Sequence, residues 1–532
     1  MHNRTILFLN LVLAVLICAC GGGGGGSGST GGGSNSGGGG STPTENPGGE
    51  PAPAVDHATL TWDGTPGVCL SCHAEEAKQM YASAHYQWQG EALYDAANGP
   101  LLQGKISDAF NSYCINILGN WNACGSCHAG LGAAPVLTAS PTDDQLKNID
   151  CLICHQKDYK RVKVNGVFEP DTANMTISLN QAVQTVHRPD RTTCLSCHAR
   201  AGGGDAVKRG DLALASAATS DAQYDVHMSP AGANLNCVDC HTTQSHRIAG
   251  RGSDLRETDL DVEMACTTCH SDKATSNGHG TADVNRHVGR VACQTCHIPT
   301  YAKNAADTPA SEATETHRTW KTSDASAPPY HPSSVKANNL TPKYGFWNRY
   351  SINYRLGEVA QLDAKTGAYP TSRPDGDVRD TSPDNKLYPF KYKTAEQPLM
   401  SSSGKLIALD TSVYFAAANA DAAIRAGLAN MGYSENEAYT WVKTDTFQLL
   451  NHQVSPATQA LNCTDCHGTA ARVNLKDELG YTLKAAEADV CNDCHGVKAN
   501  PGFTSVHRKH VADKQLGCQN CHTFSRPERN LR

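Results

Sequence analysis

The pattern of apolar and polar positions predicts modest helices joined by short loops over residues 55–300, for example from Glu75 to Ala92. A further helix is predicted over residues 417–430, which read AANADAAIRAGLAN. Residues 301–450 are rich in Pro, Tyr and Trp, and this composition predicts a folded layer that differs from the helical region before it. No internal run approaches 18 apolar residues, which excludes a polytopic membrane protein. We expect a mainly α fold with much irregular loop and low strand content.

The amino terminus reads as an export signal. Arg4 supplies a positive charge, and Ile6 to Ile17 form an apolar stretch that is too short to be a comfortable membrane-spanning helix. A small residue precedes Cys20, as in bacterial lipoprotein signals, so cleavage would remove residues 1–19 and leave Cys20 as the acylated first residue. The alternative is an ordinary signal peptide with two incidental cysteines.

Residues 20–54 are almost entirely Gly, Ser, Thr and Pro, a composition that cannot fold alone. We expect a flexible tether with a mean span of roughly 30–35 Å. The exported body would then hang from a lipid anchor. The absence of Asp just after Cys20 favours the outer membrane, with the periplasmic or cell-surface face left open.

Composition narrows the class of protein. Hydrophobic residues make 39% of the 532 residues and aromatic residues only 6%, which is low for the several cores that this length could hold. Something other than side chains is therefore expected to fill part of the interior. The net charge of −7, from 45 basic and 52 acidic residues, excludes a nucleic-acid binder that works through a broad positive field.

The cysteines follow one rule. Of the 23 cysteines, twenty form ten pairs spaced C-x-x-C, and a histidine follows each pair at once. Cys18 and Cys20 belong to the signal region, and Cys114 is left over. The ten motifs consist of Cys69, Cys72 and His73; Cys124, Cys127 and His128; Cys151, Cys154 and His155; Cys194, Cys197 and His198; Cys237, Cys240 and His241; Cys266, Cys269 and His270; Cys293, Cys296 and His297; Cys463, Cys466 and His467; Cys491, Cys494 and His495; and Cys518, Cys521 and His522.

C-x-x-C-H is the attachment site of a c-type haem. Two thiols add across the vinyl groups of one porphyrin, and the adjacent histidine ligates the iron from the proximal side. Disulfides would not require a histidine after every second cysteine, and zinc sites pair C-x-x-C with a second ligand pair. Ten copies therefore predict ten covalently bound haem c groups, and the porphyrins would supply the missing core.

The histidines outside the motifs are candidate distal ligands. Twelve remain after removal of the signal, and only seven methionines exist, so His–Met ligation cannot serve ten haems. A second imidazole suits electron transfer and tends to hold the potential low. Several of these histidines lie so near a motif that they should serve another haem, which predicts an interlocked chain of closely spaced haems. The favoured ligands are His85, His187, His227, His246, His279, His287, His452, His507 and His510, with His57, His317 and His331 set aside.

The motifs also divide the chain. We expect a haem domain with seven motifs over residues 55–300, a non-haem layer over 301–450, and a haem segment with three motifs over 451–532.

The runs between the motifs carry a family resemblance. Residues 202–241 read GGGDAVKRGDLALA…YDVHMSPAGANLNCVDCH, and CINILGNWNACGSCHAGLG begins at Cys114. With VACQTCHIP from Val291 and NHQVSPATQALNCTDCH from Asn451, the chain resembles the octahaem tetrathionate reductase family of c-type cytochromes over roughly residues 60–482. The last two motifs lie beyond the usual end of that family, whose members are typically soluble.

The resemblance implies an active site. One haem would be catalytic, held by Cys124, Cys127 and His128, with a lysine in place of a distal histidine. The lysine of the GGGD-x-x-K run matches Lys208, with Asp205 three residues earlier, and a cysteine near the haem edge matches Cys114. Lys208 together with the nine favoured histidines would give ten distal ligands.

Two functions remain open. The first is a respiratory reductase that takes electrons from quinol-linked or periplasmic cytochromes and reduces a small sulfur or nitrogen oxyanion, as tetrathionate, nitrite and hydroxylamine reductases do. The second is a non-catalytic conduit that passes electrons to partner cytochromes or extracellular metal oxides. Neither involves nucleic acid, the lipid anchor is the only expected contact with the membrane, and self-association is left open.

Overall fold

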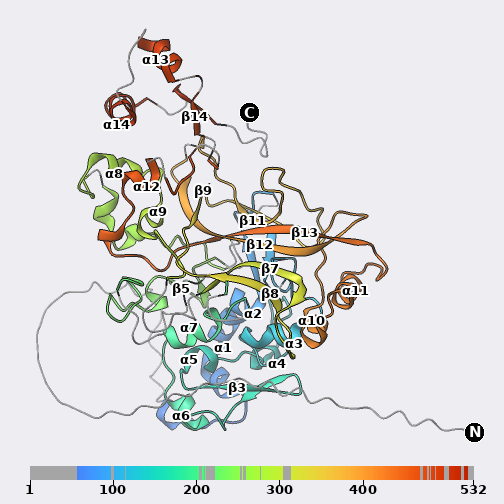
Figure 1. The fold of residues 1–532 in the computed structure, drawn as a ribbon. Helices are drawn as coiled ribbons and strands as arrows, with labels where there is room; N and C mark the ends of the chain where they lie inside the picture. Colours follow the sequence, from blue (N-terminus) through green and yellow to red (C-terminus); the bar gives the residue numbers. More distant parts are fainter. Residues whose placement is uncertain are drawn as a thin grey trace, which may run out of the picture. The chain divides into compact units, whose positions relative to one another are not determined.

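The structure is a computed structural model (Figure 1), and it describes residues 57–97, 101–113, 115–202, 207–208, 210, 212, 222–251, 255, 259–275, 277–303, 313–380, 382–467, 471–475, 478–479, 481–483, 485, 487–495, 502–516 and 520–524. The predicted signal, the tether and the acylation site Cys20 lie outside the described residues, as do Cys114, Asp205 and Cys518.

The helices are short, and most of the motifs lie on them. The α-helices are α1 (Gly67–Tyr81), α2 (Ala84–Gln87), α3 (Trp121–Cys124), α4 (Asp143–Lys147), α5 (Leu152–His155), α6 (Leu179–Gln184), α7 (Arg191–His198), α8 (Ala282–His287), α9 (Cys293–His297), α10 (Thr411–Ala417), α11 (Ala420–Asn430), α12 (Cys463–His467), α13 (Glu487–His495) and α14 (Phe503–His507). Single 3₁₀ turns are η1 (His57–Thr59), η2 (Gly125–Cys127), η4 (Cys237–Asp239), η5 (Cys266–Thr268), η6 (Ser271–Ala274) and η7 (Ala457–Gln459), and η8 (Arg508–Asp513) is π-helical.

Seven strands form one mixed sheet, in the order β10-β11-β13-β12-β7-β8 with β9 also paired to β12. Its longest strand, β12, runs antiparallel to β13 and parallel to β7. Figure 1 shows these strands together, with α10 and α11 beside them. The sheet consists of β7 (Thr314–Ser323), β8 (Pro332–Ala337), β9 (Lys343–Trp347), β10 (Ser351–Asn353), β11 (Tyr369–Pro374), β12 (Lys386–Met400) and β13 (Tyr439–Leu449).

The remaining strands form four two-stranded antiparallel pairs. They are β1 (Gln89–Ala92) with β2 (Leu101–Gly104), β3 (Arg161–Val164) with β4 (Val167–Pro170), β5 (Thr243–Gln244) with β6 (Arg247–Ile248), and β14 (Tyr481–Leu483) with β15 (His522–Phe524).

About 28% of the structure is helical and 24% is strand, with much loop, which is roughly consistent with the predicted fold class. The sheet nevertheless gives more strand than the sequence analysis expected. Within the stretch predicted as one helix, 417–430, the chain changes direction because Ala418 has a left-handed φ of 53°. The side chain of Asn419 then caps α11 by accepting a hydrogen bond from Ala422 N.

The largest apolar core lies where the sheet meets α10 and α11. Trp320 from β7, Tyr414 from α10 and Ile424 and Leu428 from α11 are all fully buried in one cluster. The aromatic rings of Trp320 and Tyr414 meet edge to face, with centroids 5.2 Å apart. This layer therefore has a side-chain core of its own, which makes it a firm support for the segments that rest on it.

Among the described residues, no helix is both long enough and apolar enough to span a bilayer.

Candidate functional site

The cysteine pairs of the first nine motifs lie on or beside single helical turns, which bring both sulfur atoms and the following histidine near one another. Asp190, for example, caps α7 by accepting from Thr193 N, so that helix begins three residues before the cysteine pair at 194–197. None of the cysteines whose side chains the structure describes is in a disulfide. Free paired thiols beside a histidine are what covalent haem attachment requires.

Thiols of different motifs also approach one another. A hydrogen bond from Cys127 lowers the pKa of Cys197 to about 6, and one from Cys266 lowers the pKa of Cys293 to about 6, in both cases against the effect of burial. Thiols of neighbouring motifs therefore lie within hydrogen-bond reach of one another.

Eight motif histidines face a second histidine. Two imidazoles that bind one metal through nitrogen bonds of about 2 Å have ring centroids about 6 Å apart. The observed separations lie between 5.4 and 6.4 Å. The facing rings are His57 with His73, His85 with His198, His155 with His246, His227 with His270, His241 with His452, His287 with His467, His495 with His510, and His507 with His522.

The ninth motif histidine, His297, has His279 as an electrostatic neighbour. Burial first, and then His279, lowers the pKa of His297. His279 is itself held by the hydrogen bond from its main-chain N to Asn285 Oδ1, at 2.7 Å.

Hydrogen bonds at Nδ1 of several histidines determine which ring nitrogen is available to bind iron. The Nδ1 atom of His241 lies 2.8 Å from Ala249 O, and that of His510 lies 2.9 Å from Val506 O. A ring that donates Nδ1–H to a carbonyl presents Nε2 to a metal. The residues therefore fit haem, and the facing histidines would hold its iron.

Two histidines have surroundings that differ from what the distal predictions would suggest. The ring of His187 has Nδ1 2.7 Å from Arg188 O and Nε2 3.0 Å from the donating Lys157 N, so both nitrogens are occupied. His57, which the sequence analysis set aside, stacks parallel to His73 with an interplanar angle of 2°. The other two histidines set aside have partners of a different kind, His317 at Thr394 Oγ1 and His331 beside the Phe415 ring.

His128 is the exception among the motif histidines. Among the described residues, no histidine ring faces it; it is fully buried, with Nε2 2.5 Å from Tyr86 O. Trp88 and Trp121 contact its ring edge to face, with centroids 6.0 and 5.0 Å away. Burial lowers the pKa of His128 to about 4, so the imidazole is neutral.

Arg161 fixes the loop that carries His128. Its guanidinium donates to Ser126 O at 2.8 Å, to His128 O at 2.7 Å and to Gly130 O at 3.0 Å, and it pairs with Asp150 Oδ2 at 3.1 Å. Only 8% of the Arg161 side chain and 3% of the Asp150 side chain are exposed. The proximal side of this site is therefore held by a buried ion pair and three carbonyl contacts.

The loop that carries Cys114 is bound from several directions. Its flanking carbonyls accept hydrogen bonds from side chains of the sheet and of the β2 region, so the path of the main chain on both sides of residue 114 is fixed. The contacts are Gln397 Nε2 to Asn111 O at 3.2 Å, Trp320 Nε1 to Ser112 O at 3.2 Å, and Lys105 Nζ to Ile115 O at 3.1 Å.

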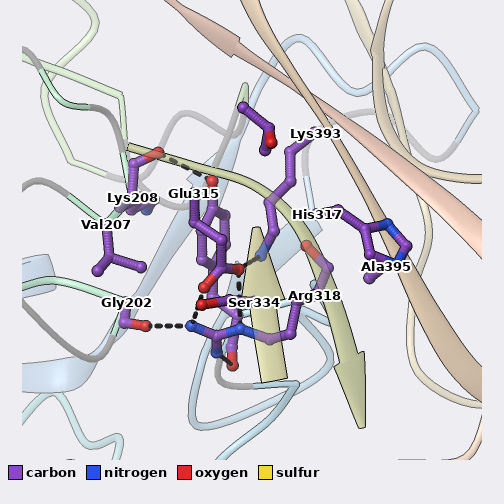
Figure 2. A network of polar contacts seen from close by, with 12 residues as sticks. Gly202, Val207, Lys208, Glu315, His317, Arg318, Ser334, Lys393 and Ala395 are labelled. Atoms are coloured by element: carbon purple, nitrogen blue, oxygen red, sulfur yellow. Dashed lines mark hydrogen bonds and ion pairs between the residues drawn. The ribbon is translucent and has the colours of Figure 1, made fainter. Parts of the chain in front are cut away.

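The same loop lies against the run that carries Lys208. Tyr113 Oη is 2.8 Å from Lys208 O, although 95 residues separate the two positions. The structure thus brings Lys208 next to the neighbour of Cys114, while Asp205 and Cys114 themselves lie outside the described residues. Figure 2 shows the polar network behind this junction, in which Arg318 and Lys393 converge on Glu315.

The sequence analysis missed these network residues. Lys391 and Lys393 stand two residues apart in the aromatic run YPFKYK, and this period-two pattern is the signal that would have placed both on one face of a strand. Polar groups on the inner face of a strand are unusual and invite a search for buried partners.

Comparison with known proteins gives two family matches. Residues 311–470 match the family described as Cytochrome c bacterial, and residues 68–156 match the family Cytochrome c554 and c-prime. An uncharacterized protein of Archaeoglobus fulgidus is 29% identical over 237 residues, which cover 35% of this chain and 76% of the relative.

A solved structure matches more of the chain. The octahaem cytochrome c from Shewanella oneidensis has a TM-score of 0.66 and 28% sequence identity, and the match covers 84% of this chain and 100% of that one. Together with the attachment motifs, these matches identify the chain as a multihaem c-type cytochrome related to octahaem cytochrome c.

Proposed function

We propose that this cytochrome carries ten haems and reduces a small sulfur or nitrogen oxyanion at the haem held by Cys124, Cys127 and His128, with Lys208 as the distal ligand. The observation that carries the proposal is the difference between His128 and the other nine motif histidines. Eight face a second histidine ring, His297 has His279 as an electrostatic neighbour, and His128 has neither among the described residues. A haem without a second imidazole is the one that can bind a substrate.

The bound haem would supply the iron and pass on the electrons that a redox partner delivers. Lys208 would bind as the neutral amine and leave as the ammonium ion, which frees a position for the substrate. Asp205 would hold that ammonium or pass protons, and Cys114 would stand at the edge of the site. The loop around His128, held by Arg161, keeps the proximal ligand in place during this exchange.

Spectroscopy and turnover test this proposal together. The pyridine haemochrome of the purified protein should give ten haems per chain. The oxidised protein should show nine haems with the EPR signals of bis-imidazole iron and one haem that differs. Reduced methyl viologen should be oxidised by tetrathionate, nitrite or hydroxylamine. Ten bis-imidazole haems together with no turnover of any of the three substrates would refute the reductase.

We propose His57, and not His187, as the distal ligand opposite His73. Replacing His57 by alanine should open one coordination position and convert one low-spin haem into a high-spin haem, visible in the EPR spectrum of the oxidised protein. The same replacement at His187 is the matched control and should leave all low-spin signals unchanged, because its ring nitrogens are already bonded to the main chain. The reverse result, with the new signal in the His187 variant, would restore the original assignment.

A second candidate function is electron conduction. The facing pairs His495–His510 and His507–His522 belong to the last two motifs, and the related solved structure is described as octahaem. Two additional haems at one end of the chain suit an outlet to partner cytochromes or an extracellular acceptor. Rapid oxidation of the reduced protein by ferric citrate, without turnover of any oxyanion, would favour this function.

A further inference from the structure

Four ionisable side chains are buried together behind the Lys208 run. Glu315 is 1% exposed, Arg318 6%, and Lys391 and Lys393 0%. Among the described residues, the cluster combines one carboxylate with three basic side chains. Burying a charged side chain costs free energy unless hydrogen bonds or opposite charges compensate for it. The acceptors of these basic side chains therefore show which segments the cluster holds in place.

Lys391 uses its whole donor capacity on the Lys208 run and its neighbour. Its ammonium donates to Val207 O at 2.9 Å, to Lys208 O at 2.7 Å and to Thr314 Oγ1 at 2.6 Å. An ammonium has three N–H donors, and all three are engaged. Two of these acceptors are main-chain carbonyls and the third is a hydroxyl, so Lys391 is bonded directly to the segment that it holds.

Arg318 connects the loop before Cys114 to the same buried cluster. Its guanidinium forms two parallel hydrogen bonds of 2.8 Å with the carboxylate of Glu315. The same guanidinium donates to Tyr113 O and, at 3.0 Å, to Gly202 O. One side chain therefore binds the residue before Cys114 and the start of the run that leads to Lys208.

Tyr113 lies between the two lysines and the run. Lys393 Nζ, which is ion-paired with Glu315, stands 3.4 Å from the centre of the Tyr113 ring, and Lys391 Nζ stands 5.4 Å from it. A cation over the face of an aromatic ring is attracted by the ring quadrupole. The two segments approach each other closely at Gly202, where a Cβ atom would lie 3.2 Å from both Lys208 Cβ and Tyr113 Cδ1.

The sheet explains why four charges can converge. Lys391 and Lys393 are two residues apart on β12 and so point to the same face. Glu315 and Arg318 would point to opposite faces of a regular β7, but the pairing of β7 with β8 shifts register between Glu315 and His317. Such a bulge re-aims the side chains that follow it, and it turns Arg318 back toward Glu315 (Figure 2).

We propose that Lys391 is a positioning residue, which together with Arg318 and Tyr113 clamps the main chain of residues 207–208 so that the Lys208 amine is held at the haem. This inference rests on the proposed function, since it assumes that Lys208 is the distal ligand. The clamp acts through main-chain carbonyls and does not touch the substrate. A weakened clamp should make Lys208 easier to displace without changing the other haems.

Lys391→Met tests the clamp, because it keeps the length of the side chain and removes its donors. Cyanide competes with Lys208 for the ferric iron, so the rate at which potassium cyanide binds reports how firmly the amine is held. We expect this rate to rise about tenfold or more, since a hydrogen bond from a charged donor is worth roughly that factor. The EPR signal of the one distinct haem should broaden or shift while the bis-imidazole signals and the haem count stay unchanged.

Lys405→Met is the matched control. Lys405 belongs to the same non-haem layer and donates to Tyr433 Oη at 3.0 Å, remote in sequence from the Lys208 run. Its cyanide rate and EPR spectrum should equal those of the unmodified protein. Wild-type cyanide kinetics and an unchanged spectrum in the Lys391 variant would overturn the clamp.

Tyr113→Phe guards against loss of folding in the Lys391 variant, because it removes only the hydroxyl that lies 2.8 Å from Lys208 O. It should accelerate cyanide binding in the same direction by a smaller factor, and no acceleration would again overturn the clamp. A different variant, Lys208→His, tests the proposed function independently of the clamp. If Lys208→His leaves the EPR spectrum of the distinct haem unchanged, Lys208 is not its distal ligand. If Lys208→His alters that spectrum but the Lys391 and Tyr113 variants bind cyanide at the wild-type rate, only the clamp is refuted.

Discussion

Lys208→His should reduce oxyanion turnover at least about 100-fold while leaving the haem content unchanged. The conjugate acids of lysine and histidine have pKa values of about 10.4 and 6.5, so an imidazole gains far less than an amine by taking up a proton and leaving the iron at neutral pH. The distal coordination position would then stay occupied, and the substrate could not bind the iron. The distinct EPR signal should be replaced by a tenth bis-imidazole signal, and the oxidation of the reduced protein by ferric citrate should be unaffected.

Lys147→His is the control for this substitution. Lys147 lies at the end of α4 with 48% of its side chain exposed, and its nearest acidic partner is Asp144 at 3.9 Å. This variant should retain full turnover and the wild-type spectrum. Full turnover in the Lys208 variant would mean that catalysis takes place at another haem or at none.

Glu315→Gln should destabilise the protein by about 3–5 kcal/mol, the usual effect of removing one partner from a buried ion pair. Glu315 is the only carboxylate among the four buried groups of the cluster, and its loss removes the ion pairs that it forms with Arg318 and Lys393. Thermal and guanidinium midpoints of the holoprotein, compared with those of the unmodified protein, measure the effect.

Glu396→Gln provides the matched comparison, because it makes the same chemical change on β12. Glu396 pairs with Lys321 at 2.5 Å, but the two side chains are 35% and 38% exposed, and pairs at such positions contribute only about 0–1 kcal/mol. Equal midpoints for the two variants would show that the buried cluster does not depend on Glu315.

The same carboxylate predicts how stability changes with pH. Burial alone raises the pKa of Glu315, but Lys393 and Arg318 outweigh burial and hold the net pKa below its usual value. A folded-state pKa that is depressed below the unfolded value of about 4.3 stabilises the fold above that pH, and this contribution is lost as the pH falls through the folded-state pKa. Acid destabilisation below about pH 4 should therefore be weaker in Glu315→Gln than in the unmodified protein.

The haem sites and their partners differ in how far the sequence could predict them. Attachment needs two cysteines and a histidine within five residues, so its chemistry is complete inside one helical turn and can be read directly. The partner of His241 is His452, which is 211 positions away in the numbering, and no local pattern connects the two. For this reason candidate distal histidines could be named from the sequence, while the pairs that they form could not.

The sheet illustrates a second limit. Aromatic and proline-rich runs such as YPFKY predicted a folded layer, but strand pairing is a contact between distant segments, and β12 pairs with strands on both sides along its length. The bulge in β7 that brings Arg318 to Glu315 likewise depends on the register with β8. Neither the sheet nor the buried charges could be derived from local propensity.

The sequence by itself determined that this chain is built to carry c-type haems, because covalent attachment is short-range chemistry written in consecutive residues. The tertiary structure alone decided which histidines face each other, that His128 stands apart among the described motif histidines, and that buried cations hold the Lys208 run. These features depend on where distant segments meet, which is set by packing around the sheet and not by the spacing of residues along the chain.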